Sequence, residues 1–361
     1  MTRLQEELTD AEQTKVVPRV SRLRNRNEGP AISLPFGKGG LWAPLAVAAV
    51  GLVALPFLSS FLKYIFAIAL AYGVAATGVG IAFSSVGMLV AYQSATMLTG
   101  CYMALWALSS GWTFWGALVL GLMGGIVLSL IMAIATLALN DFAFAVLGFS
   151  FAFLAQNLVE SPTMASWSGG DVGRTLPISS VFGLKMNVPQ NAYVVNLIVA
   201  CAVLVVLAIV VRSSFGRAAV NVRFNPFAAS LIGIPVPLMR VGWVALAGGL
   251  GGLGGALASM SQSYVAPNTY DPVLGVIMVA LALAGGYRHL AGAILGSAVL
   301  WGTTQSLQMS QTNRDILVGF ILLVVLVFAR DGLLGAACSF LRWTVGKHRS
   351  EDLSVDGKLG G

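Results

Sequence analysis

The sequence has 361 residues, of which 57% are apolar and only 10% are charged, and its net charge is +7. Soluble globular domains carry about 25% charged residues, so this composition excludes a water-soluble protein and predicts a membrane protein with much of its surface facing lipid. Three widely spaced cysteines and two histidines provide neither a disulfide framework nor a metal cage, and we expect no metal site.

Residues 1–40 are polar and include four arginines between positions 19 and 26. A secretory signal places a short basic region directly before an apolar run, whereas the first apolar run here starts near Leu41. We expect a poorly ordered cytoplasmic tail. The alternative is a basic anchor on anionic lipid.

Apolar stretches close to the 20 residues that cross a bilayer follow in series. They predict an all-α polytopic membrane domain over residues 41–335, with about ten transmembrane helices and eight as the lower bound. A break at Gly285-Gly286-Tyr287-Arg288 is either a tight turn or a re-entrant break. The expected spans are 41–62, 64–84, 86–108, 115–139, 142–160, 191–211, 241–261, 273–287, 290–308 and 315–330.

The distribution of arginine predicts the orientation of these spans, because cytoplasmic loops are rich in Lys and Arg. The loop 212–240 holds four arginines and no acidic residue, which predicts that it is cytoplasmic. The loop 161–190 is then external. Both termini, including the tail 336–361, are expected on the cytoplasmic side.

The loop 212–240 is patterned more than a simple connection requires. Apolar and small residues between arginines predict short helical pieces, with a break at Asn225-Pro226. We expect it to dock onto a cytoplasmic partner; a loop lying on the lipid surface is the alternative. The residues expected to couple the chain to its partner are Gly216, Arg217, Arg223, Asn225, Pro226, Phe227, Ala229 and Gly233.

The predicted membrane interior lacks ionisable residues, since Lys63, Asp141, Glu160 and Asp271 all fall at span ends. A proton- or ion-coupled carrier normally places such groups in the middle of the bilayer. A neutral polar pathway is expected instead. Its candidate residues are Gln93, Thr96, Thr99, Gln156 and Asn157.

Catalytic and nucleotide-binding motifs are absent from the sequence. There is no G-x-x-x-x-G-K-[ST] phosphate loop, no H-E-x-x-H and no G-x-S-x-G. The chain is therefore not expected to be an enzyme or to bind a cofactor directly, and any ATP is expected to be used by partner subunits. The few basic residues fit membrane orientation, so nucleic-acid binding is not expected.

Glycines form the last pattern. Gly248 with Gly252, and Gly251 with Gly255, make two GxxxG pairs that predict close helix packing or sliding during gating. Gly285 and Gly286, at the predicted break between two spans, are also expected to take part in helix packing or gating. A matching cluster near Gly73 suggests an inverted repeat.

Several segments together resemble one family. GRAAVNVRFNPFAASLIGI resembles a G-R-A-L-R-A-I-R-E-N-P-L-A-A-R-A-L-G-I pattern, and AGGYRHLAGAILGSA, FARDGLLG and SGGDVGRTLPI resemble three further elements of it. The patterns that these segments resemble are those of the permeases of branched-chain amino acid ABC importers. The resemblance is closer to the longer of the two permease subunits. The resemblance covers residues from about 70 to 335.

The resemblance implies a pore-forming subunit in the inner (plasma) membrane. Its implied partners are ATP-binding-cassette ATPase subunits, a second permease subunit that is a paralogue or a second copy, and an external solute-binding protein. The expected cargo is a small solute, led by branched-chain amino acids and followed by amide- or urea-like solutes. A stand-alone secondary transporter or channel, or a sugar-type ABC permease, is the alternative.

Overall fold

The computed structural model describes residues 43–54, 56, 58–137, 139–181, 183–286, 289–306 and 319. The predicted tails 1–40 and 336–361 lie outside these residues, as does the predicted span 315–330 apart from Gly319.

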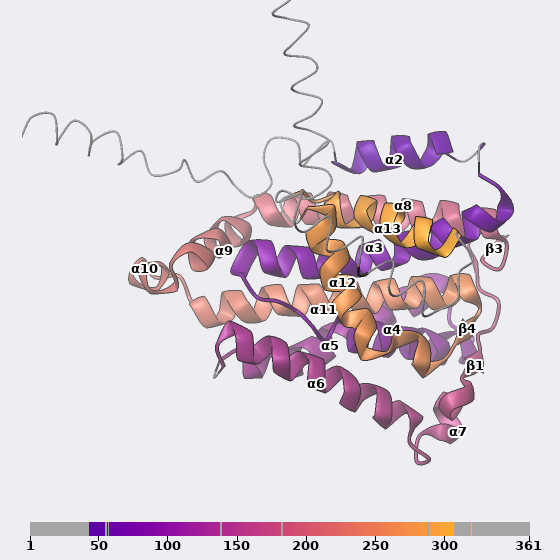
Figure 1. Cartoon of the computed structure of the whole chain (residues 1–361), viewed down its shortest axis with the longest axis horizontal. Coiled ribbons are helices and arrows are strands. Elements are labelled where there is room, and N and C mark those ends of the chain that lie inside the picture. The colour runs from indigo at the N-terminus through magenta and orange to yellow at the C-terminus, as the bar shows by residue number, and fades with distance from the viewer. Residues whose placement is uncertain are drawn as a thin grey trace, which may run out of the picture.

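The described chain is mostly helical and forms an elongated bundle (Figure 1). Within the part of the chain that the structure describes, six helices are long and apolar enough to cross a membrane: α3 (Ser60–Val86), α5 (Phe114–Ala135), α6 (Asp141–Glu160), α8 (Pro189–Arg212), α11 (Val236–Gln262), and α12 (Pro272–Gly285) together with the 3₁₀ turn η4 (Pro267–Tyr270) that precedes it. This agrees with the predicted all-α polytopic membrane fold. The count of about ten helices and the cytoplasmic termini remain predictions.

The first predicted span, 41–62, is divided in the structure. Helix α2 (Ala43–Ala54) ends before α3 begins, and Ser59 caps α3 by accepting the backbone N–H of Leu62. Twelve helical residues extend only about 18 Å, which is shorter than the hydrocarbon core of about 30 Å. The prediction of one continuous first span was therefore wrong.

The third predicted span, 86–108, also differs from the structure. Helix α3 continues to Val86 and ends at Gly87, whose φ of 79° places it in the left-handed region. A mostly buried, non-helical segment, 88–92, then leads to α4 (Gln93–Ser109). Non-helical backbone is tolerated at membrane depth only where protein or a water-filled cavity surrounds it.

Helix α4 starts beside the middle of the bundle. The side-chain amide of Gln93 donates to the carbonyls of Ala75 in α3, at 2.8 Å, and Ala247 in α11, at 3.1 Å. Both acceptors lie near the middle of 27-residue helices. The segment 88–92 therefore runs back from the end of α3 toward its centre.

Helix α11 packs between α3, α4 and α5, and its glycines make this possible (Figure 1). Gly248 and Gly252 lie against the backbone and Ser129 side chain of α5, whereas Gly251 and Gly255 face α4. A third face, at Gly254, meets Ala71 and Ala75 of α3. Small residues allow membrane helices to approach this closely.

Helices α12 and α13 (Gly292–Ser306) form a hairpin. Gly285 touches Gly292 where the two helices join, and α13 then runs antiparallel to α3, with Ile294 beside Gly73 and Gly302 beside Phe66. Gly73 is the middle of α3, so the closed end of the hairpin lies at mid-bundle. This mid-bundle position of the closed end favours the re-entrant break over two complete spans.

The two ends of the bundle differ in structure. One end, here called the arginine end, carries α9 (Ser214–Phe224) and α10 (Pro226–Leu231). The opposite end, here called the loop end, carries α7 (Ala165–Ser168), the 3₁₀ turn η3 (Gly170–Val172) and four two-residue strands. Strand β1 (Arg174–Thr175) pairs antiparallel with β4 (Tyr264–Val265), and β2 (Ser180–Val181) with β3 (Leu184–Lys185). The predicted external loop 161–190 therefore lies at the end opposite the arginine-rich segment.

Candidate functional site

The arginine-rich segment folds into two short helices. The side chain of Ser213 caps α9 by accepting the N–H of Gly216, and Asn225 caps α10 by accepting the N–H of Ala228 at 3.0 Å. Pro226 occupies the first turn of α10, where its missing N–H costs nothing. The chain therefore breaks at Asn225-Pro226, as the sequence suggests. Helix α11 begins at Val236, five residues before the start of the predicted span 241–261.

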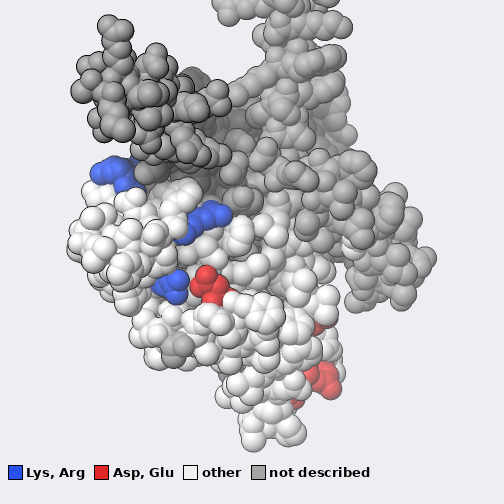
Figure 2. Space-filling view, turned by 60° about the vertical axis from the view of Figure 1, so that its left-hand side comes forward, with Lys and Arg blue, Asp and Glu red and all other residues white. Residues whose placement is uncertain are grey.

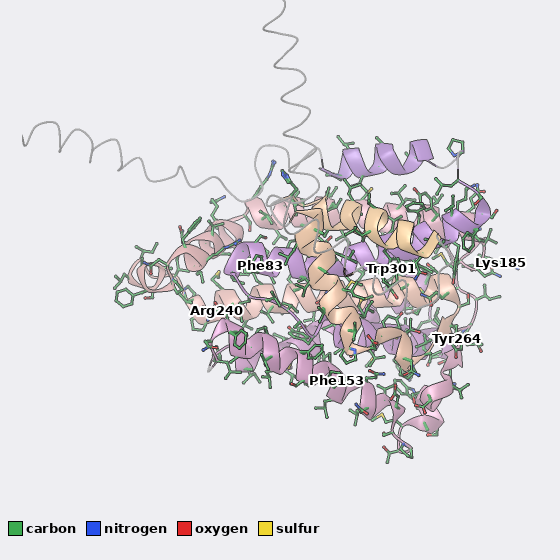
Figure 3. All side chains as sticks on the ribbon, in the orientation of Figure 1. Phe83, Phe153, Lys185, Arg240, Tyr264 and Trp301 are labelled. Atoms are coloured by element: carbon green, nitrogen blue, oxygen red, sulfur yellow. The ribbon has the colours of Figure 1, made fainter. Side chains whose placement is uncertain are left out.

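Arg223 joins this segment to α3. Its guanidinium donates to the carbonyl of Ser84 at 2.6 Å and lies 5.2 Å from the ring centre of Phe83. Figure 3 shows Phe83 at the arginine end of the bundle. A charge-assisted hydrogen bond and a cation–π contact act together here, so Arg223 ties α9 to the last turn of α3.

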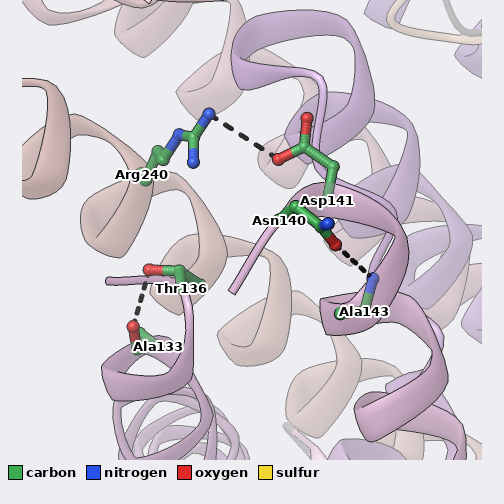
Figure 4. Close-up of polar contacts among 6 residues, drawn as sticks. All are labelled: Ala133, Thr136, Asn140, Asp141, Ala143 and Arg240. Carbon is green, nitrogen blue, oxygen red and sulfur yellow. Dashed lines mark hydrogen bonds and ion pairs between the residues drawn. The ribbon is translucent and has the colours of Figure 1, made fainter. Parts of the chain in front are cut away.

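A second link joins α11 to α6 at the same end (Figure 4). Arg240 lies 3.6 Å from the carboxylate of Asp141, and Asn140 caps α6 by accepting the N–H of Ala143 at 2.9 Å. In Figure 2, basic groups gather on the side that carries α9 and α10, and one of them lies beside an acidic group. A partly exposed ion pair of this kind contributes little to stability, and it marks where α11 and α6 approach each other at this end.

The remaining predicted coupling residues shape the segment itself. Arg217 bonds locally, to the carbonyl of Arg212 and the hydroxyl of Ser214. A side chain at Gly216 would collide with Val211, and Gly233 has a φ of 81° that favours glycine. Buried Ala229 packs with Val222 and Met239. These residues position the segment.

Four large apolar side chains project from the segment into solvent. We call them the α10 surface, and they are between 70% and 73% exposed: Phe224, Phe227, Leu231 and Ile232. Helix α10 protrudes from the bundle at the arginine end (Figure 1). Clustered exposed aromatic and aliphatic residues are typical of the centre of a protein interface.

The predicted pathway residues fall into two separate groups. Gln93 and Thr96 are fully buried between α4 and α11, and the hydroxyls of Thr96 and Thr99 donate to carbonyls of their own helix. Gln156 instead donates to Glu160 and Asn268 near the loop end, and Asn157 donates to the Phe153 carbonyl on exposed α6. The structure does not bring the five residues to one place.

A cavity of about 580 Å³ opens among α3, α11, η4, α12 and α13. Its wall combines aromatic rings with side-chain amides, and Tyr72 and Trp301 form a tilted ring pair 4.8 Å apart. The sequence did not predict this cavity. Asp271-Pro272 is a helix-start signal, but such a signal does not indicate a cavity. The lining residues are Phe61, Tyr64, Ile65, Ile68, Tyr72, Gln262, Asn268, Thr269, Asp271, Val273, Leu274, Ile277, Trp301 and Gln305.

Comparisons with known proteins identify the family. The family described as branched-chain amino acid transport system / permease component matches residues 61–327. No curated protein matches the chain. Among solved structures, the chain is similar to PsaBC from Streptococcus pneumoniae in complex with Fab, with 16% identity and a TM-score of 0.42, over 77% of this chain and 94% of that one.

Within the described residues, no three His, Cys, Asp or Glu side chains come together in a way that could hold a metal ion.

The match over residues 61–327 spans α3 to α13 and includes both the arginine-rich segment and the cavity. The chain is therefore a multi-pass membrane protein that belongs to the permease-component family of branched-chain amino acid transport systems.

Proposed function

We propose that this permease is the pore-forming subunit of an importer in the inner membrane, driven by separate ATP-binding-cassette ATPase subunits. A second permease subunit, either a paralogue or another copy, completes the pore, and an external solute-binding protein delivers the solute. The cargo is a small solute, with branched-chain amino acids or related amide-bearing solutes as the first candidates.

The α9–α10 segment is the observation that carries this proposal. It leaves the α10 surface exposed, and Arg223 connects it to the end of α3. Helix α3 in turn packs along α11 and α13. Movement of a partner bound to α10 therefore has a direct route into the helices that surround the cavity.

The charges of the described helices support an external source of energy. Asp141 and Glu160 are the first and last residues of α6, and Lys63 lies in the first turn of α3. Asp271, at the start of α12, lines the cavity. No acidic residue is buried among the described residues. Coupling to a proton gradient normally uses ionisable groups deep inside the bundle.

Isolation of the complex tests this proposal. The full chain, tagged and expressed with the ABC ATPases of its own organism, is expected to co-purify with an ATPase after membrane solubilisation. Enzymatic ATP hydrolysis by the purified material should appear only when the ATPase is present. If the chain is recovered as a folded bundle with none of these ATPases bound, the importer proposal is wrong and a stand-alone transporter takes its place.

A further inference from the structure

The described wall of the cavity carries charge of one sign. Among its described lining residues, Asp271 is the one charged group. The carboxylate oxygen Oδ1 accepts the N–H of Leu274 at 2.9 Å and so caps α12. The described residues offer this carboxylate no ionic partner, because the ion pair they contain joins Arg240 to Asp141. Among the described residues, the cavity lining therefore carries one negative charge and no positive charge.

Asp271 also lies some distance inside the bundle, measured from its loop end. Gly275, one helical turn later, packs against the Ala91 carbonyl and the Ser94 hydroxyl. Those residues adjoin Gln93, which bonds to Ala247 near the middle of α11. Since α11 rises about 22 Å from Ala247 to its end, the carboxylate is recessed on the order of 10 Å below that end.

The rest of the wall suits an organic cation better than a metal ion. Phe61, Tyr64, Tyr72 and Trp301 contribute aromatic rings to the lining, and the faces of such rings attract ammonium groups. Figure 3 shows Trp301 on the part of the bundle toward the loop end. The amides of Gln262, Asn268 and Gln305 add neutral polar groups. A volume of about 580 Å³ is in the range of small-molecule sites.

We infer that this cavity holds the ammonium group of the transported solute against Asp271, with the apolar part of the solute at the Tyr72–Trp301 pair. The inference rests on the proposed function, because it names the chemistry of the cargo. It selects small amines and amino acids over urea-like solutes, sugars and carboxylate anions. A carboxylate in the wall of a cavity attracts cations and repels anions.

Charge-selective thiol labelling tests this inference without any ATPase. Thr269, an exposed residue of the cavity wall, is replaced by cysteine in the full chain, and the protein is placed in lipid nanodiscs. Two methanethiosulfonates are compared, one with an aminoethyl and one with a sulfonatoethyl group. Among the natural cysteines, Cys101 is buried and Cys201 half-buried. The labelling of the parent chain is subtracted as background.

Asp271→Asn is the decisive variant, because asparagine caps a helix about as well as aspartate and only the charge is removed. We expect the cation-to-anion ratio of labelling rates to fall roughly fivefold in this variant. Asp171→Asn removes an exposed acidic residue of the external loop and should leave the ratio unchanged.

Protection by solutes of the same shape completes the test. Isopentylamine should slow the labelling of Thr269→Cys more than isopentanol does, and this difference should vanish in Asp271→Asn. An unchanged rate ratio in Asp271→Asn, or equal protection by the amine and the alcohol, would overturn the inference. Neither result depends on ATP, so the importer proposal would still be judged separately by isolation of the complex.

Discussion

Gly252→Ala is expected to destabilise the helix bundle, because α11 has no room for an added methyl group at this position. A Cβ atom at this position would collide with the Gly121 carbonyl and press on the backbone of Gly125 in α5. On another face of α11, the carbonyl of Gly252 lies against Gly100 of α4. Backbone atoms cannot rotate away as a flexible side chain can, so relief requires separation of whole helices. Overpacking of this kind costs about 1–3 kcal/mol.

Gly80→Ala is the matched control. Gly80 also lies in a long helix, but a Cβ atom there would meet only Ala282, at an ordinary 3.7 Å. The thermal midpoint of each variant, measured in the same detergent by the loss of monodisperse protein on heating, should be clearly lower for Gly252→Ala and close to that of the parent for Gly80→Ala. Equal midpoints for the two variants would mean that α4, α5 and α11 are not in close contact.

Phe227→Asp is expected to weaken binding of the partner ATPase strongly while the permease remains folded. Phe227 is 73% exposed at the tip of the bundle, and changes at such positions have little effect on folding. In a complex, the same side chain would be buried in a partner pocket, where its loss typically costs 2 kcal/mol or more. That corresponds to roughly a thirtyfold loss of affinity. Pull-down of the ATPase by the tagged permease measures it.

Arg223→Ala should behave differently, and the contrast separates docking from coupling. The guanidinium points to Ser84 and Phe83 of α3 instead of outward, so the ATPase should still bind while ATP-driven uptake falls. Leu184→Asp, an exposed apolar position at the loop end, is the control and should alter neither binding nor uptake. If Phe227→Asp retained the ATPase as well as Leu184→Asp does, the α10 surface would not be the docking site.

The sequence predicted the parts of the fold that depend on local patterns. Hydropathy located α5, α6, α8 and α11 to within about five residues at each end, and the Asn225-Pro226 signal marked the break between α9 and α10. The spacing of Gly248, Gly251, Gly252 and Gly255 places them on two faces, and the structure packs these faces against α5 and α4. These features follow from composition and period within a single segment.

Other features could not be predicted because they depend on tertiary packing. A continuous apolar run cannot distinguish a helix from a buried extended segment, and so the non-helical residues 88–92 were included in a span. The cavity escaped notice because its wall combines residues as distant in sequence as Phe61 and Gln305. The direction of the Arg223 side chain depends on the position of α3, which the loop sequence alone does not contain.

Solute movement out of sealed proteoliposomes tests most directly the claim that a partner ATPase, proposed to act through α9 and α10, supplies the energy for transport. The permease, its partner subunits and the solute-binding protein are reconstituted with the ATPase facing outward, and radiolabelled leucine and a panel of small amines are enclosed with the solute-binding protein. ATP added outside should drive solute out of the vesicles, and omission of either ATP or the ATPase should stop this movement. Solute movement at the same rate without the ATPase would contradict the account.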